Sequence, residues 1–339
     1  MTESPQGGSA PRRSRLTLVT GGAGFIGSHL IDALMAGGAP VRVLDDLSSG
    51  RRENLESVSA QVEFVEGDIR DLAVVRQACD GVDLVFHLAA VGSVPRSMKD
   101  PAHTFSVNVG GTANVFAVAR DAGVRRIVYA SSSSVYGDSE TLPKREGEEG
   151  RPLSPYALSK RMNEELADVF ARCYVMELIG LRYFNVFGPR QDPEGPYAAV
   201  VPRFFKSCLR GESPVIYGDG EQSRDFTFIS DAVQANLRAA TARASACGRA
   251  YNVAGGRGVT VNELATAVRE VAGVGSAPRH EAPRYGDIRH SLADLTRTKA
   301  ELGYQPTTEL SAGLKASLEY YREALAGARP VRPMGSSRS

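Results

Sequence analysis

The first half of the chain alternates between short apolar segments and longer amphipathic segments. Five apolar runs rich in β-branched residues have the length of strands that are buried on both faces: Leu16–Thr20, Val41–Leu44, Val62–Glu66, Leu84–Leu88 and Ile127–Ala130. Helical periodicity separates them, as at Phe25–Met35, Leu72–Cys79 and Thr112–Ala122. This alternation predicts an α/β fold in which a parallel, doubly wound sheet carries right-handed crossover helices.

The rhythm changes after about Asn185, where proline and glycine become frequent and the apolar runs shorten. Two isolated helical segments remain, Asn262–Val271 and Leu310–Leu325. We therefore expect a smaller α/β substrate-binding region built from the C-terminal half. The expected division is a larger domain from residues 15–186 plus 226–256, a smaller one from 187–225 plus 257–326, and disordered tails at 1–14 and 327–339.

Composition restricts the class of protein. The 339 residues are 42% hydrophobic and 23% charged, and the net charge of +1 favours neither nucleic acid nor a membrane as partner. No apolar run reaches the ~18 residues that span a bilayer, so we expect a cytoplasmic protein. The four cysteines, Cys79, Cys173, Cys208 and Cys247, form no CxxC pair. This favours free buried thiols over disulfides or zinc ligands, and we expect no metal site.

A glycine-rich turn follows the first predicted strand. In "LTLVTGGAGFIGSHL", Gly21, Gly24 and Gly27 come directly after the strand and at the start of a helix. Glycines in this context permit a tight turn, close approach of the backbone to a pyrophosphate, and close packing of helix on strand. The glycine triplet by itself is weak evidence, but the strand, the helix and a downstream acid agree with a dinucleotide site.

That acid is Asp45, which ends the second predicted strand 18 residues after Gly27. A carboxylate there binds the adenosine ribose hydroxyls and repels the 2′-phosphate of NADP, so NAD is the predicted cofactor. Asp68 follows the third strand and would lie beside the adenine. The alternative for both residues is a solvated turn position.

The segment "LSPYALSKRMNEEL" places Tyr156 and Lys160 four residues apart. Ser154 can cap the helix and Pro155 suits its first turn, so both side chains are expected on one helix face. Most such pairs are surface pairs. Behind a dinucleotide site, however, the lysine and the nicotinamide charge can lower the pKa of the tyrosine from ~10 and make it a base.

With these motifs, the chain resembles the extended short-chain dehydrogenase/reductase family over about Leu16 to Ala326. The resemblance is carried by "TGGAGFIG", "HLAA", "SSSSVYG", Tyr156-x-x-x-Lys160 and "LRYFNVFGP". Within the family the chain is most similar to nucleotide-sugar 4-epimerases, especially bacterial UDP-N-acetylhexosamine 4-epimerases. Longer stretches support this placement: "GSVPRS", "FGPRQDPEGPYAAVVPRF", "YGDGEQSRDFTFI" and "GDIRHSLAD".

The resemblance implies a Rossmann domain with tightly bound NAD and a catalytic set of Ser132, Tyr156 and Lys160. It implies that the cofactor is contacted by Gly21, Gly24, Phe25, Ile26, Gly27, Asp45, Asp68, Ile69, Leu88, Ala89, Ala90, Asn108, Tyr156, Lys160 and Tyr183. It implies that a UDP-sugar is contacted by Ser93, Ser132, Ser133, Tyr156, Asn185, Val200, Tyr217, Arg224, Arg289 and Ser291. Arg224 and Arg289 match the arginines that bind the diphosphate, although an isolated arginine is usually a solvated surface residue.

The four serines from Ser131 to Ser134 then separate into roles. Ser132 matches the residue that passes a proton between the sugar O4 and Tyr156, and its alternative is a serine that only closes a strand. Family members that dehydrate sugars carry Asp-Glu after this serine, whereas this chain has hydroxyls. A 4-keto sugar formed here can therefore only be reduced again, after it has rotated to present its other face. Ser133 would bond a 2-acetamido group, and Ser131 is left as structural.

Two further positions bear on the substrate. Many galactose epimerases have a lysine after the "HLAA"-like strand, whereas this chain has Val91-Gly92-Ser93, as in the N-acetylhexosamine subgroup. Ser291 matches the residue that faces the sugar's C2 substituent, where a small side chain leaves room for an N-acetyl group. Its alternative is a serine that caps a turn.

Other functions stay open at this point. Within enzymes they are a UDP-glucuronate 4-epimerase, or a dehydratase or decarboxylase. A catalytically silent NAD-binding protein is the alternative of another class, because a fold does not determine a function. Related enzymes pair two helices across a two-fold axis, which predicts a homodimer through Thr112–Ala122 and Tyr156–Tyr174.

Overall fold

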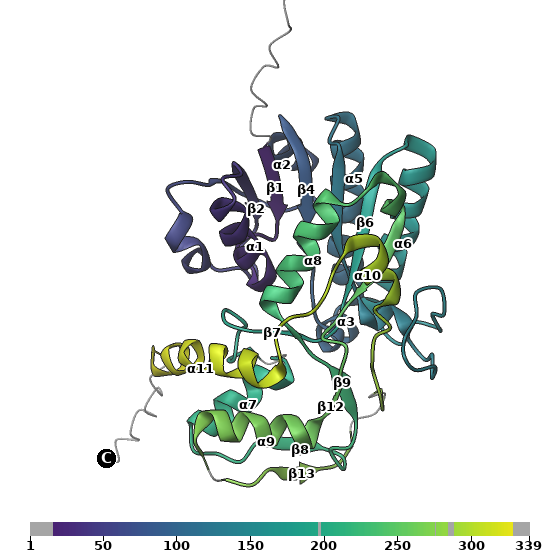
Figure 1. Cartoon of the computed structure of the whole chain (residues 1–339). Helices are drawn as coiled ribbons and strands as arrows, with labels where there is room; N and C mark the ends of the chain where they lie inside the picture. The colour runs from purple at the N-terminus through teal and green to yellow at the C-terminus, as the bar shows by residue number, and fades with distance from the viewer. Residues whose placement is uncertain (1–15, 196–197, 275, 284–287, 328–339) are drawn as a thin grey trace, which may run out of the picture.

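The computed structural model describes residues 16–195, 198–274, 276–283 and 288–327 (Figure 1). Its centre is a seven-stranded sheet of order β11-β6-β5-β4-β1-β2-β3, in which every neighbouring pair is parallel. Its strands are β1 (Leu16–Thr20), β2 (Val41–Asp45), β3 (Glu63–Glu66), β4 (Val82–His87), β5 (Arg126–Ser132), β6 (Glu177–Tyr183) and β11 (Arg249–Val253). The predicted parallel, doubly wound sheet is confirmed.

Helices cover both faces of this sheet and give three layers (Figure 1). One face carries α1 (Phe25–Ala36) and α8 (Ile229–Thr241), and the other carries α2 (Leu72–Cys79), α5 (Thr112–Asp121) and α6 (Pro155–Tyr174). The neighbours Leu18 and Val19 of β1 belong to the two opposite apolar clusters. Because side chains alternate along a strand, a strand covered on both faces needs the continuous apolar run seen in the sequence.

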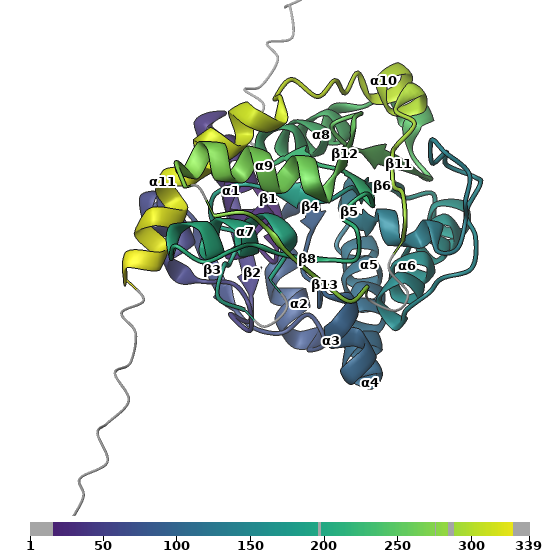
Figure 2. The same cartoon turned by 90° about the horizontal axis from the view of Figure 1, so that it is seen from below.

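A smaller C-terminal region lies against the lower edge of the sheet in Figure 1 and faces the viewer in Figure 2. Its helices α7 (Val200–Leu209), α9 (Val261–Ala272) and α11 (Leu310–Gly327) pack around an apolar cluster that includes Phe205 and Tyr321. Its strands pair as β8 (Val215–Tyr217) with β13 (Arg279–Glu281), β9 (Ser223–Asp225) with β12 (Gly258–Thr260), and β7 (Val186–Phe187) with β10 (Thr227–Phe228). The expected domain boundaries stay a prediction. The expected tails lie outside the described residues, except for Gly327.

The remaining helices connect these parts. Two short helices, α3 (Val94–Lys99) and α4 (Pro101–Phe105), lead into a turn of π-helix at Ser106–Gly111, and α10 (Thr296–Leu302) packs beside β11. Along the described part of the chain, no helix is long and apolar enough to cross a membrane.

All four cysteines are free, as expected. Their expected burial holds for Cys79 and Cys208 but is wrong for Cys173, which is exposed near the end of α6, and Cys247 is only half-buried.

The strands of the large sheet end at one edge, next to the smaller region (Figure 1). The pairing registers place Thr20 beside His87 and His87 beside Tyr129, so β5 and β6 extend three residues beyond the ends of β1 and β4, to Ser132 and Tyr183. Ligands of doubly wound folds bind outside the carboxyl ends of the strands. The predicted site residues therefore gather where the fold leaves room for a ligand.

Candidate active site

The glycine-rich turn forms a cradle that side chains would fill. Gly21 has φ +69° and donates its N–H to the carbonyl of Leu44 at 2.8 Å. A Cβ at Gly21 would lie 2.7 Å from the backbone nitrogen of Ala89, and one at Gly27 would lie 2.2 Å from the carbonyl oxygen of Gly21. Gly24 caps α1 without a side-chain hydrogen bond, so N–H groups of the first turn remain for an anion.

Asp45 ends β2 directly beside this turn and is buried. Its two carboxylate oxygens accept hydrogen bonds from the backbone N–H groups of Ala23 and Leu47, each at 2.9 Å. Burial raises the pKa of Asp45, and the two backbone donors act in the opposite direction. The carboxylate thus holds the glycine turn to the end of β2, at the place where an adenosine ribose is expected.

The adenine end of the expected site lies after β3. Asp68 is paired with Arg70 at 2.5 Å, and this pairing lowers its pKa. Ile69 is buried against Gly111, where a Cβ would lie 2.5 Å from the Ile69 side chain. Close packing here explains a glycine in the π-helical turn, because any larger residue would displace Ile69.

The segment after β4 is held from two sides. Leu88 and Ala89 donate N–H bonds to the carbonyl and hydroxyl oxygens of Thr20, at 3.1 and 3.3 Å. Asn108 accepts from the N–H of Val91 and donates to the carbonyl of Val91 and to Ser159. Its amide is thus engaged within the protein, and a direct contact between Asn108 and the cofactor stays a prediction.

Helix α6, which carries Tyr156 and Lys160, begins as expected. The Ser154 hydroxyl accepts from the N–H of Ala157 at 3.1 Å, and Pro155 occupies the first turn. Tyr156 and Lys160 therefore project from one face, with the Lys160 nitrogen 6.0 Å from the centroid of the Tyr156 ring. Lys160 is buried, and its ammonium donates to the carbonyl oxygen of Ala130 at 2.9 Å.

Ser132 closes β5 opposite this helix and contacts the phenol of Tyr156. Its hydroxyl oxygen also accepts from the Ser134 hydroxyl at 2.9 Å and from the Ser134 N–H at 3.2 Å. In both bonds the Ser132 oxygen is the acceptor. The hydroxyl proton of Ser132 therefore remains available for another acceptor. The structure thus brings Ser132, Tyr156 and Lys160 together, and it adds Ser134, which sequence reasoning did not assign.

Burial governs the ionisation of these groups. It raises the pKa of Tyr156, while the hydrogen bond with Ser132 lowers it. It lowers the pKa of Lys160 to about 8. The lowered tyrosine pKa that we expect for catalysis therefore depends on the positive charge of oxidised nicotinamide as well as on Lys160.

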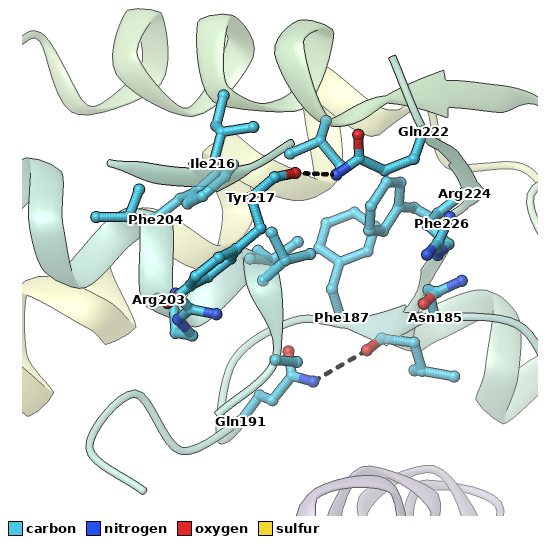
Figure 3. Close-up of a pocket in the computed structure, with 16 residues that line it drawn as sticks. Asn185, Phe187, Gln191, Arg203, Phe204, Ile216, Tyr217, Gln222, Arg224 and Phe226 are labelled. Carbon is cyan, nitrogen blue, oxygen red and sulfur yellow. Dashed lines mark hydrogen bonds between the residues drawn. The ribbon is translucent and has the colours of Figure 1, made fainter. Parts of the chain in front are cut away.

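A pocket of about 260 Å³ opens in the smaller region, next to the end of β6 (Figure 3). Four predicted substrate residues line it: Asn185, Val200, Tyr217 and Arg224. Figure 3 also shows residues that the sequence did not single out, among them Gln191, Arg203, Gln222 and Phe226. Arg203 lies over the Tyr217 ring, with its guanidinium carbon 5.5 Å from the ring centroid. These residues lie within the stretches "FGPRQDPEGPYAAVVPRF" and "YGDGEQSRDFTFI", which carry the family resemblance, and that is their signal in the sequence.

The other predicted substrate residues are not among those that line this pocket. Arg289 is exposed and makes two hydrogen bonds to Asp219, at 2.9 and 2.8 Å, so its role at the diphosphate stays a prediction. Ser93 caps α3 by accepting from the N–H of Arg96, and Ser133 is half-buried at the end of β5. Ser291 is buried, and its N–H donates to the carbonyl of Ser223.

Comparisons with known proteins agree with this geometry. The description "NAD dependent epimerase/dehydratase family" applies to a family profile that matches residues 17–254. A UDP-glucose 4-epimerase of Mycolicibacterium smegmatis is 42% identical over 310 residues, which cover 90% of this chain and 98% of that protein.

Two solved structures are similar over most of both chains. UDP-glucose 4-epimerase of Thermotoga maritima, determined with UDP-glucose, is 39% identical with a TM-score of 0.87, and 91% of this chain and 99% of that chain are covered. UDP-N-acetylglucosamine 4-epimerase of Methanobrevibacter ruminantium M1, in complex with UDP-N-acetylmuramic acid, is 37% identical with the same TM-score and coverage.

The chain therefore belongs to the NAD dependent epimerase/dehydratase family. Its cofactor is NAD, as the family description states and as the glycine cradle and Asp45 fit. The expected Rossmann-type fold and the expected NAD cofactor are therefore confirmed.

Proposed function

We propose that this protein is an NAD-dependent nucleotide-sugar 4-epimerase that interconverts UDP-GlcNAc and UDP-GalNAc. The family, the fold and the similarity to two kinds of UDP-sugar 4-epimerase support the reaction class. The observation that carries the substrate choice is Ser291. Its backbone bond to Ser223 sets it beside β9, the strand whose next residue, Arg224, lines the pocket.

A small side chain at this position leaves room at C2 of the sugar, where the family resemblance puts residue 291. Serine accommodates an N-acetyl group, and Ser133 supplies a hydroxyl partner for it that a plain 2-OH would reach poorly. One such hydrogen bond contributes ~0.5–1.5 kcal/mol. We therefore expect acetylated sugars to be preferred over UDP-Glc and UDP-Gal.

The chain's own residues move one proton during the reaction. Tyr156 takes the proton of the sugar 4-OH through Ser132, and Lys160 stabilises the phenolate. Bound NAD supplies the oxidation and reduction of C4. Asn185, Arg224 and Arg289 hold the diphosphate while the 4-keto sugar rotates, so that C4 is reduced on its opposite face and Tyr156 returns the proton to O4 through Ser132.

No carboxylate follows Ser132 in the sequence, where Ser133 and Ser134 stand. Elimination of water from the sugar needs an additional acid and base, and decarboxylation needs a carboxyl on the substrate. This argues against a dehydratase. It leaves a UDP-glucuronate 4-epimerase, a decarboxylase that acts on a uronic acid sugar, and a catalytically silent NAD-binding protein as alternatives that activity measurements decide.

A second candidate is UDP-glucose 4-epimerase activity as the main function. The specific observation in its favour is that the similar proteins from Mycolicibacterium smegmatis and Thermotoga maritima both bear that name. The two candidate functions use the same site. They differ only in whether the site has space for an N-acetyl group at C2 of the sugar.

The test is incubation with UDP-GlcNAc, UDP-GalNAc, UDP-Glc and UDP-GlcA, with products resolved by NMR. Ser291→Tyr is expected to lower turnover of both acetylated sugars by at least ~10²-fold while sparing UDP-Gal, because the ring occupies the space of the acetamido group. Ser291→Ala is the matched control and should keep all activities. Undiminished UDP-GlcNAc turnover by Ser291→Tyr would exclude Ser291 as the residue that selects the substrate.

A further inference from the structure

A buried cluster of charges lies behind the catalytic pair, in contact with α6 and the sheet. At its centre is Arg182 of β6, whose side chain is 6% exposed, between Glu149 and Glu164, each 10% exposed. Arg182 makes a two-bond contact with Glu164, at 2.8 and 2.7 Å, and donates to Glu149 and to the Tyr136 hydroxyl. Buried ion pairs often add little to stability compared with apolar packing, so a cluster of this kind calls for another role.

Glu164 is also tied to the strand that carries Ser132. Glu164 lies four residues after Lys160 on α6, and the two side chains form hydrogen bonds with consecutive residues of β5. Lys160 donates to the carbonyl of Ala130 at 2.9 Å, and the hydroxyl of Ser131 donates to Glu164 at 2.5 Å. Residues four apart on a helix are neighbours, so the carboxylate lies one turn beyond the ammonium on the face that meets β5.

The field of Glu164 acts on Lys160. Burial lowers the pKa of Lys160 to about 8, and the negative charge of Glu164 raises it against burial. Without that charge, the pKa of Lys160 would fall further, and the lysine would become neutral nearer to neutral pH.

The titratable groups His87, Tyr129 and Tyr183 of the sheet do not replace this charge. His87 on β4 is buried between Thr20 and Thr112, which lowers its pKa to about 3, so it is uncharged. Burial raises the pKa of Tyr129 on β5 and of Tyr183 on β6, so both are neutral phenols.

The charges of the buried cluster balance one another. Arg182 is positive but is shared between two carboxylates, Glu149 and Glu164. Glu149 also accepts from the N–H of Gly147. With Lys160, the four charged groups sum to zero, so removal of either carboxylate leaves one excess positive charge.

We propose that Glu164 is a positioning residue of the active site, which keeps Lys160 charged and acts on Tyr156 through it, with Ser131 fixing the carboxylate. The proposal rests on the proposed roles of Tyr156 and Lys160. Ser131, which we took as structural from the sequence, thereby gains a part in the site.

The alkaline limb of the pH–rate profile should respond. The reactive form needs Tyr156 deprotonated and Lys160 protonated, so activity rises through the apparent pKa of the first group and falls through that of the second. In Glu164→Gln, the lysine loses its proton at lower pH, whereas the tyrosine titrates on the acid limb, where Lys160 is still protonated. The bell of kcat/KM should therefore narrow on its alkaline side, by about one pH unit.

Glu149→Gln is the matched control, because it removes an equally buried carboxylate from the same arginine without a neighbour at Lys160. The kcat/KM profile of Glu149→Gln should keep both apparent pKa values of the unsubstituted protein. Glu164→Asp keeps the charge and should restore most of the width. Equal narrowing in the two glutamine variants would overturn the proposal, since the effect would then come from Arg182 or from general loss of structure. An unchanged bell in folded Glu164→Gln would overturn it as well.

A second readout is independent of turnover. The ultraviolet absorbance of tyrosinate, followed against pH in the NAD-loaded protein with Tyr156→Phe as the blank, reports the pKa of Tyr156. That pKa should not rise in Glu164→Gln, because Lys160 is still protonated where Tyr156 titrates, and it should stay in place in Glu149→Gln. A higher tyrosine pKa in Glu164→Gln would overturn the proposal. If Tyr156→Phe is itself fully active, the proposed function fails. If Tyr156→Phe is inactive and the alkaline limb of Glu164→Gln does not move, only the role of Glu164 fails.

Thermal unfolding shows whether Glu164→Gln folds. If it does not, Ser131→Ala takes its place, because it removes the hydroxyl that fixes the carboxylate on the β5 side. It should narrow the bell in the same direction by about half a pH unit. A bell of unchanged width in Ser131→Ala would then count against the proposal.

Discussion

Gly27→Ala offers a strict test of the cofactor site, because the added methyl group meets backbone on every side. Its Cβ would lie 2.2 Å from the Gly21 carbonyl oxygen and 2.7 Å from the Cα of Gly22. The first separation must grow by about 0.8 Å to reach 3.0 Å. No flexible side chain can give way, so the start of α1 must move away from β1.

The expected cost has two parts. Overpacking of this kind lowers the free energy of unfolding by ~1–3 kcal/mol. Displacement of α1 also removes a hydrogen bond between a backbone N–H and a pyrophosphate, worth ~1.5–3 kcal/mol, which corresponds to a roughly 10- to 100-fold weaker affinity for NAD.

The assay measures NAD or NADH released when protein purified without added cofactor is denatured, and the melting temperature with and without NAD. The unsubstituted protein should release cofactor, because an epimerase returns it unchanged. Gly27→Ala should release much less and melt at a lower temperature. Gly110→Ala is the control, since a Cβ there meets no atom within 4 Å, and it should behave like the parent protein. If Gly27→Ala keeps the cofactor content and melting temperature of the unsubstituted protein, the glycine turn is not the close-fitting cofactor site that we describe.

Three further outcomes are expected. Tyr156→Phe should lower kcat by ~10²–10⁴-fold with little change in KM, as for loss of a general base, and near-full activity would contradict that role. Arg224→Ala should raise KM by roughly 10- to 100-fold; Arg289→Ala should raise it less, because that guanidinium must first leave Asp219, and the reverse order would contradict the geometry. The protein should sediment as a homodimer, because α6 exposes Leu158, Met162 and Val169 on one side; Met162→Asp should give monomers, and a monomeric parent protein would contradict the dimer.

Local patterns predicted much of the large sheet. The strand before the glycine turn and helix α2 match their predicted limits, and Ser154 caps α6 as expected. Each of these follows from residues within a few positions of one another. β6 and β11 were not predicted, because β6 contains Gly180 and Arg182 and β11 carries Arg249 and Asn252 among its five residues. Those polar residues fit a buried strand only because partners distant in sequence bind them.

The pocket of the smaller region shows the same limit. Gln191, Arg203 and Gln222 lie in stretches that carry the family resemblance, but nothing in their local sequence assigns their side chains to a pocket. Gln191 and Gln222 donate to the backbone carbonyls of Val186 and Tyr217 (Figure 3). Such contacts depend on how the smaller region folds against the sheet, which periodicity does not describe.

The serine run at the end of β5 joins the two kinds of information. Alternation along a strand puts Tyr129 and Ser131 on one face and Ala130 and Ser132 on the other. The sequence alone therefore separates the two serines, but it does not show what either of them meets. The structure adds that Ser131 faces a carboxylate of α6, whereas Ser132 meets the phenol of Tyr156. One short strand end thus faces two sets of groups, the phenol of Tyr156 and the charges behind the lysine. This explains why hydroxyls rather than apolar side chains follow one another there.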